Sequence, residues 1–245
     1  MIRSFLKILL IFVLGVLGGL WAQIYLLPYL AGLDYFQDFQ FVKMLKNRKM
    51  VVYPKTENTI IVQENVALQS AVERSEKVVI GVKTKTQKGE VLTGSGLIVT
   101  SDGLLITLAD LVPRGSDFYF YVGGEWPAYQ ILKRDLENNL ALVKIEKGSL
   151  PTAGFADLEK TKLGERVFLV GTVFKEEGVE YIVNEGIIKS FQESFVQTNI
   201  FEDAHISGSP LFDISGNVVG LNMIDEEGNV SAVPVNTIRE FMGLE

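Results

Sequence analysis

From Lys77 onward, hydrophobic residues recur with the two-residue period of β-strands, and glycine-rich or charged turns separate the short runs. The first set of expected strands comprises residues 78–83, 96–99, 104–107, 118–122, 128–132 and 140–145. The second set comprises residues 166–170, 179–183, 186–190, 196–198, 218–223 and 230–233. Many short strands with regular turn signals predict closed or sandwiched antiparallel sheets, so we expect an all-β domain of two six-stranded units.

Composition excludes several classes of function. The chain has 245 residues, of which 47% are hydrophobic, enough for a full core. It has no cysteine, which excludes a disulfide framework, and its single histidine, His205, excludes a histidine-based metal cluster. We expect no metal and no cofactor. Residues 1–49 carry a net charge of +4 and the whole chain −7, so the rest is acidic and a poor partner for nucleic acid.

The N-terminal segment is apolar. Residues 8–33 contain no charged side chain, and roughly 20 apolar residues span a bilayer as a helix. The run is longer than the apolar region of a signal peptide, about 7–15 residues, and contains no convincing cleavage site. We therefore expect residues 1–34 to form an uncleaved transmembrane helix, with a cleaved signal peptide as the alternative. Basic residues flank the run on both sides, so charge leaves the orientation open.

The remaining boundaries follow from helix and turn signals. We expect residues 35–76 to form a juxtamembrane stalk with a short helix capped by Asn65, residues 77–150 the first β-unit and residues 151–245 the second. Asn236 is expected to cap a terminal helix over residues 237–242.

One stretch carries the strongest chemical signal. Residues 202–211 read Glu-Asp-Ala-His-Ile-Ser-Gly-Ser-Pro-Leu, which places Ser207 on a sharp turn before an apolar strand. A serine in such a turn can expose its hydroxyl as a nucleophile and offer its own N–H to a developing oxyanion. Taken alone, the motif is also compatible with a simple hairpin loop.

Other motifs occur in a fixed order around this serine: residues 94–107, 139–145, 164–171 and 195–199. Together they make the chain from about residue 77 to residue 240 resemble the HtrA (Deg) family of trypsin-like serine proteases. The resemblance implies a trypsin-like double antiparallel β-barrel, with peptides or proteins as partners and a homotrimer as a family assembly. Membrane-anchored members place this domain outside the bacterial cytoplasm. Many members continue into a PDZ domain, which we do not expect here.

The resemblance also locates the catalytic positions. The base histidine of the family motif Thr-Asn-x-His-Val-Val falls on Asp110, and the orienting aspartate of Asp-Leu-Ala-Val-Leu-Lys falls on Asn139. The nucleophile is retained as Ser207. The oxyanion-hole positions fall on His205 and Ser207, and His205 replaces a glycine of the family motif. Because a Cβ restricts the backbone there, we expect the oxyanion hole to be unformed.

These replacements remove the proton shuttle that a serine protease needs. Losing the histidine costs roughly 10⁶ in turnover, and replacing the aspartate by asparagine roughly 10⁴. A carboxylate is a far weaker base than an imidazole, so Asp110 is a poor substitute. The residues have structural interpretations as well: Asp110 as an N-cap for the turn at residues 111–113, Asn139 as a polar residue entering a buried strand, and His205 as an exposed loop residue.

Three functions follow as hypotheses. The first is a membrane-anchored, proteolytically inactive pseudoprotease that binds peptides or proteins, an active homologue among them, by strand addition at a sheet edge. The alternative is a weak or unconventional serine endopeptidase that acts through Ser207 with Asp110 or His205. The third is a purely structural domain that holds partners near the membrane.

Overall fold

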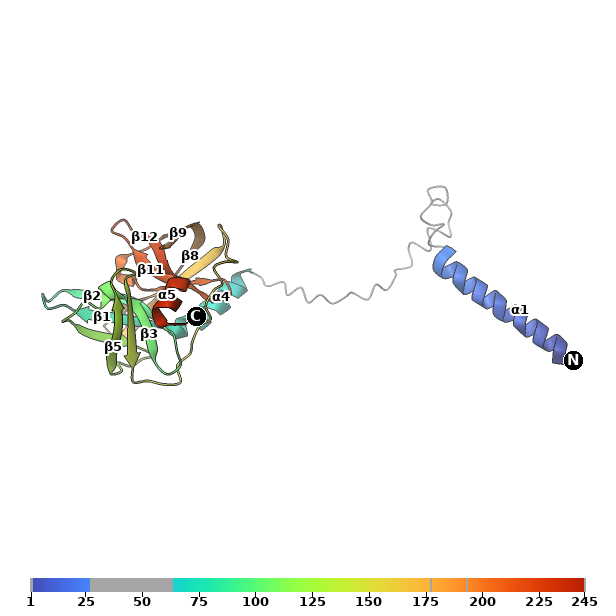
Figure 1. Cartoon of the computed structure of the whole chain (residues 1–245), viewed down its shortest axis with the longest axis horizontal. Helices are drawn as coiled ribbons and strands as arrows, with labels where there is room; N and C mark the ends of the chain where they lie inside the picture. Colours follow the sequence, from blue (N-terminus) through green and yellow to red (C-terminus); the bar gives the residue numbers. More distant parts are fainter. Residues whose placement is uncertain (1, 27–63, 177, 193, 245) are drawn as a thin grey trace. The chain divides into compact units, whose positions relative to one another are not determined.

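The computed structural model describes residues 2–26, 64–176, 178–192 and 194–244 (Figure 1). The chain divides into two compact units, residues 1–60 and 61–245. In the first unit, helix α1 (Ile2–Trp21) continues as a short π-helix, η1 (Ala22–Leu26). Within the described residues, no helix meets the length and hydropathy needed to cross a bilayer, so the expected transmembrane helix is not confirmed. Most of the expected stalk, residues 35–63, lies outside the described residues.

The second unit begins with helix α4 (Glu64–Ser75), followed by the 3-10 turn η3 (Glu76–Val78). The helix starts one residue before Asn65, so the expectation that Asn65 is its N-cap is wrong. Ala71 is fully buried, and Leu68 and Val72 pack beside it against the core. The helix is therefore fixed to the β-domain by its apolar positions.

The first six strands form one antiparallel sheet in the order β4-β1-β2-β3-β6-β5. Their bounds are β1 (Val79–Lys85), β2 (Val91–Ile98), β3 (Leu104–Leu108), β4 (Asp117–Tyr121), β5 (Tyr129–Asp135) and β6 (Leu140–Ile145). The sheet curls until its two edges approach each other: the rings of Phe120 on β4 and Tyr129 on β5 lie 5.1 Å apart between centroids. This first barrel is left unpaired between β4 and β5.

The second six strands form a closed barrel in the order β10-β11-β12-β9-β8-β7. Their bounds are β7 (Arg166–Lys175), β8 (Gly178–Phe191), β9 (Val196–Phe201), β10 (Pro210–Asp213), β11 (Val218–Ile224) and β12 (Asn229–Pro234). The expected strands at residues 179–183 and 186–190 are a single strand, because β8 pairs with β7 continuously from Gly178 to Ile187. With this correction, the predicted all-β domain of two six-stranded antiparallel units is confirmed.

The strands follow from alternating burial. In β4, for example, Phe118 and Phe120 are buried, whereas Asp117 and Tyr119 are exposed. The main core contains residues of both barrels, among them Phe120 from the first and Phe168 and Phe212 from the second, so the two barrels pack into one unit.

Helix α5 (Val235–Met242) closes the fold, with Ile238 and Phe241 buried in the core. Its N-cap is Pro234, so the expected cap Asn236 lies inside the helix instead. Gly243 ends the helix in the left-handed conformation, at φ 74°.

Candidate functional site

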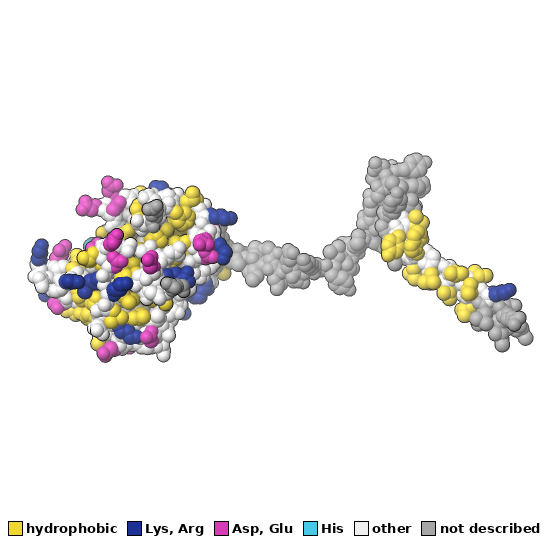
Figure 2. Space-filling model, in the orientation of Figure 1, with side chains coloured by type: hydrophobic (Ala, Val, Ile, Leu, Met, Phe, Trp, Pro, Cys, Tyr) yellow, Lys and Arg dark blue, Asp and Glu magenta, His cyan; other side chains and the backbone are white. Residues whose placement is uncertain are grey.

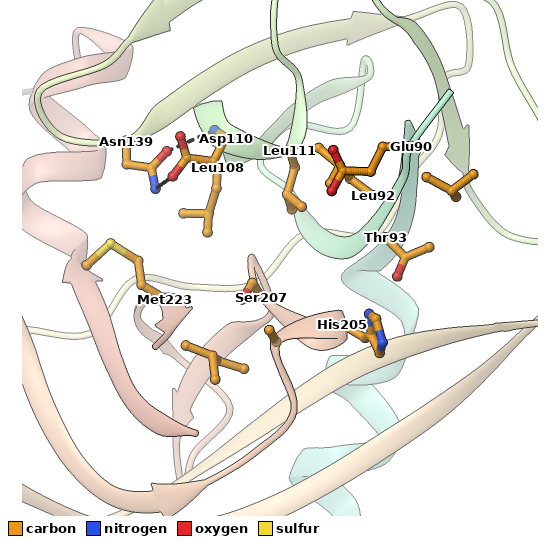
Figure 3. A pocket seen from close by; sticks show the side chains of 13 residues that line it. Glu90, Leu92, Thr93, Leu108, Asp110, Leu111, Asn139, His205, Ser207 and Met223 are labelled. Carbon is orange, nitrogen blue, oxygen red and sulfur yellow. Dashed lines mark hydrogen bonds between the residues drawn. The ribbon is translucent and has the colours of Figure 1, made fainter. Parts of the chain in front are cut away.

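A hollow of about 390 Å³ opens in the β-domain, with walls from both barrels (Figure 3). It is lined by Glu90, Val91, Leu92, Thr93, Leu108, Asp110, Leu111, Asn139, Ala204, His205, Ser207, Met223 and Ile224. We call this hollow the cleft. The structure thus brings all four residues singled out from the sequence, Asp110, Asn139, His205 and Ser207, to one place, although they come from three separate segments of the chain.

Asp110 and Asn139 bind each other. Asp110 lies in the 3-10 turn η4 (Ala109–Leu111), and Asn139 immediately precedes β6. Asn139 Nδ2 donates to Asp110 Oδ2 at 2.8 Å, and the Asp110 N–H donates to Asn139 Oδ1 at 3.0 Å. The Ala109 N–H donates to the Asn139 carbonyl oxygen at 3.1 Å. Three hydrogen bonds therefore fix Asn139 to the turn.

The local backbone conformation explains the positions of Asn139 and Asp110. Asn139 adopts φ 53°, in the left-handed region that asparagine tolerates better than most residues. The expectation that Asp110 caps the turn at residues 111–113 is wrong, because Leu108 is the N-cap of η4 and makes no side-chain cap bond. Instead, Asp110 accepts a hydrogen bond from Asn139.

The serine loop is held by close backbone contacts with β2 and β11. Ser95 N–H donates to the Ser207 carbonyl oxygen at 2.8 Å, and Gly208 N–H donates to the Asn222 carbonyl oxygen at 2.7 Å. Gly208 has φ +80°, and a Cβ there would overlap the Ser95 carbonyl oxygen. A Cβ on Gly94 would lie 2.6 Å from the Ser207 carbonyl oxygen. Both glycines are needed for the loop to approach β2 so closely.

A buried polar network supports this loop from behind. Thr172 N–H on β7 donates to Ser95 Oγ at 2.9 Å, and the Thr172 and Ser95 hydroxyls are 3.0 Å apart. Thr107 Oγ1 on β3 donates to the Ser95 carbonyl oxygen at 2.7 Å. All three side chains are buried. Because the network joins strands of both barrels, it fixes the position of Ser207 relative to the opposite wall of the cleft.

The N–H groups at the two oxyanion-hole positions are already engaged. His205 N–H donates to Asp203 Oδ1 at 2.9 Å, and Ser207 N–H donates to the Ala204 carbonyl oxygen at 3.0 Å, closing the 3-10 turn η5 (Ala204–Ile206). An oxyanion hole needs donors aimed at the reacting oxygen. Both N–H groups are hydrogen-bonded within the serine loop in this structure, and the expectation of an unformed hole stays a prediction.

The Ser207 hydroxyl has no base beside it. Within the part of the chain that the structure describes, it makes no hydrogen bond to Asp110, Asn139 or His205, and in Figure 3 the dashed lines join only Asp110 and Asn139. The His205 side chain is 73% exposed, and its Nε2 lies 3.8 Å from Asp203 Oδ1. General-base activation requires a base within hydrogen-bond reach, and none of these three side chains hydrogen-bonds to the serine hydroxyl in this structure.

Sequence reasoning missed most of the cleft lining. Glu90 and Thr93 come from the β1–β2 hairpin, more than 100 residues before the serine, and Leu111 is simply an apolar residue of η4. Nothing in their local sequence marks them as lining residues. Met223 on β11 also lines the cleft, and the sequence alone did not assign it a role.

Comparisons with known proteins agree with this geometry. The family model "Trypsin-like peptidase domain" matches residues 94–221. A probable periplasmic serine endoprotease, DegP-like, from Marinomonas sp. (strain MWYL1) is 35% identical over 101 residues, covering 38% of this chain and 21% of the relative. The corresponding protein of Pseudomonas putida (strain W619) is 33% identical over 101 residues, covering 38% and 20%. The match thus spans about a fifth of the length of these curated relatives.

Similarity to a solved HtrA-type protease structure confirms that the predicted double barrel is trypsin-like. The HtrA-type protease AlgW, solved with a tripeptide, superposes with a TM-score of 0.64 at 25% sequence identity, covering 73% of this chain and 64% of that chain.

Proposed function

Because the chain belongs to the trypsin-like peptidase family, in its HtrA/Deg branch, we propose that it is a proteolytically inactive member that binds peptides or proteins in the cleft around Ser207. The observation that carries this proposal is the Asp110–Asn139 pair, whose side chains hydrogen-bond to each other at 2.8 Å where a protease has its base and orienting carboxylate. The hydrogen bonds already made by the N–H groups of His205 and Ser207 also support this proposal.

Two features favour peptide binding over a purely structural role. The cleft is present as a hollow of about 390 Å³. On β11, pairing with β10 ends at Leu221, so Met223 and Ile224 have β12 on one side and the cleft on the other. A strand with one unpaired side can accept an extended peptide by main-chain hydrogen bonding. The HtrA-type protease AlgW was solved with a tripeptide, which supports peptide binding by analogy.

A weak serine endopeptidase acting through Ser207 is the second candidate, because the serine and its supporting network are in place. Labelling of the full chain with a fluorophosphonate probe separates the two candidates. We expect no labelling above that of Ser207→Ala, with an active DegP-like protease as the positive control. Labelling that disappears in Ser207→Ala would contradict the inactive-protein proposal.

A restoration experiment makes the same test sharper. The triple variant Asp110→His, Asn139→Asp, His205→Gly reinstates the family residues at the three altered positions. We expect it to gain labelling that Ser207→Ala removes, because the serine loop and its network are unchanged. Failure of the restored protein to react would mean that features beyond these three positions also block the chemistry.

We further propose that the N-terminal segment anchors the protein in a membrane and that the β-domain lies outside the cytoplasm. The uncharged run at residues 8–33 supports the anchor, and the description of the relatives as periplasmic supports the location. Alkaline extraction of membranes tests the anchor, which Leu10→Lys together with Leu14→Lys should weaken. Digestion of the β-domain by protease added to spheroplasts tests the location.

An active homologue is proposed as one partner, and a homotrimer as the assembly, on the family resemblance. Co-purification with a tagged DegP-like protease tests the first. Light scattering of the detergent-solubilised full chain tests the second, and a mass that corresponds to one chain would contradict it.

A further inference from the structure

We propose that a second hollow beside the serine loop receives a lysine or arginine side chain of the bound peptide. The inference rests on the proposed function, since it assumes a peptide in the cleft. The hollow has a volume of about 300 Å³ and is lined by Thr93, Val173, Phe174, Ile182, Glu202, Asp203, His205 and Ile206. It shares Thr93 and His205 with the cleft, so the two are neighbours along one surface.

The walls of this second hollow are mainly apolar. Val173 and Phe174 come from β7, Ile182 from β8, and the buried Ile206 from the serine loop. Its volume lies at the lower end of the range for small-molecule pockets, about 300–1,000 Å³, which suits one long side chain better than a whole ligand. Lysine and arginine bury their aliphatic stems on such surfaces while the charged end stays at a polar rim.

Two carboxylates supply that polar rim. Glu202 Oε1 accepts a hydrogen bond from Asn184 Nδ2 at 2.7 Å, and Asp203 Oδ1 accepts one from His205 N–H at 2.9 Å. These bonds hold the carboxylates in place and leave acceptor capacity free, because each ionised carboxylate offers about four lone-pair sites. An ammonium or guanidinium group can therefore bind them without displacing their present donors.

The charge of the surroundings is complementary to a cation. Glu90 and Asp110 line the adjoining cleft, so four carboxylates face the two hollows, and among their described lining residues His205 is the only basic one. Two lysines belong to the neighbouring strands β1 and β7. Lys175 pairs with Glu180 at 3.1 Å, and Lys83 Nζ lies 5.9 Å from the centroid of the Phe174 ring, which lines the second hollow. A peptide carboxylate would be repelled here, whereas a cationic side chain is attracted.

Fluorescence anisotropy with the full chain tests the inference. The probes are labelled decapeptides of one neutral sequence in which a single position, moved along the peptide, is lysine, acetyl-lysine or glutamate. We expect the best lysine peptide to bind at least about fivefold more tightly than its acetyl-lysine counterpart, since hydrogen bonds to charged groups contribute this much or more. The glutamate peptide is expected to bind most weakly.

Two variants assign the preference to the second hollow. Glu202→Gln with Asp203→Asn keeps the hydrogen-bond acceptors but removes the charges, and it should abolish the lysine preference. Ile182→Trp should abolish it by filling the apolar space. Glu137→Gln, an exposed carboxylate on the turn after β5, is the matched control and should leave it intact.

The outcomes separate this inference from the function on which it rests. Peptides that bind without a lysine preference, or with a preference that survives both variants, would overturn the inference and leave peptide binding standing. If no peptide binds the full chain, the proposed function fails, and this inference fails with it.

Discussion

The two walls of the cleft are held in different ways. One wall of the cleft carries the Ser207 loop, and we call it the serine wall. It is fixed by buried groups: Ser95 and Thr172 are fully buried, and Gly208 packs against the Ser95 carbonyl oxygen. The opposite wall is fixed by Asp110, which is exposed, and Asn139, which is half-buried. The fold therefore constrains the serine loop strongly and the Asp110–Asn139 pair weakly. Residues of the second wall can be substituted without disturbing the packing of the serine loop.

The largest expected effect is at Gly208. Gly208→Ala places a Cβ against the Ser95 carbonyl oxygen at φ +80°, and we expect the free energy of unfolding to fall by about 3 kcal/mol or more. Gly89→Ala is the control, because Gly89 has φ +84° with nothing within 4 Å of the added Cβ, so only backbone strain of about 1–2 kcal/mol remains. Urea denaturation measures both, and equal losses would contradict the packing argument.

The buried network comes next. Ser95→Ala leaves the buried Thr172 N–H without its acceptor, and we expect a loss of about 2 kcal/mol in the free energy of unfolding. Ser194→Ala, at an exposed position in the β8–β9 loop, should change stability by less than about 0.5 kcal/mol. A Ser95 variant as stable as the wild type would show that the serine wall is not held as described.

The opposite wall should respond less. A double-mutant cycle with Asp110→Ala and Asn139→Gly isolates the side-chain hydrogen bond between them, and we expect a coupling energy of about 1 kcal/mol. Glycine accommodates the positive φ of residue 139. A coupling energy larger than the Ser95 loss would reverse the ranking of the two walls.

The smallest effect is expected at a surface pair outside the cleft, which serves as a reference. The hydrogen bond from Lys144, at 2.8 Å, and a second one from Thr100 lower the pKa of Asp102 below its ordinary 3.8. The pair therefore stabilises the fold above the unfolded-state pKa and loses this contribution as the pH falls through the lower folded-state pKa. Asp102→Asn should reduce stability slightly at pH 7 and not at a pH below both values, as measured by thermal unfolding. An equal effect at both pH values would rule out this linkage.

Most of the fold could be predicted from the sequence because alternating burial is a local signal. The prediction of strands failed where a strand continues through an apparent turn. The segment around Asn184 and Glu185 is polar, yet β8 continues through this segment because β7 pairs with it from Gly178 to Ile187. Helix caps were also misplaced, at Asn65, Asn236 and Asp110, because side-chain type alone does not decide which residue leaves the helical conformation.

For the site, the sequence by itself determined that Ser207 has neither histidine nor aspartate at the family positions, because these are identities and need no coordinates. Only the tertiary structure decided that Asp110 and Asn139 bind each other, and that the His205 and Ser207 N–H groups are engaged. The structure also decided that Glu202 and Asp203 line the same hollow as Val173, Phe174 and Ile182. The physical reason is that a hydrogen bond or a pocket depends on the positions of atoms from distant strands, which packing of the whole core fixes.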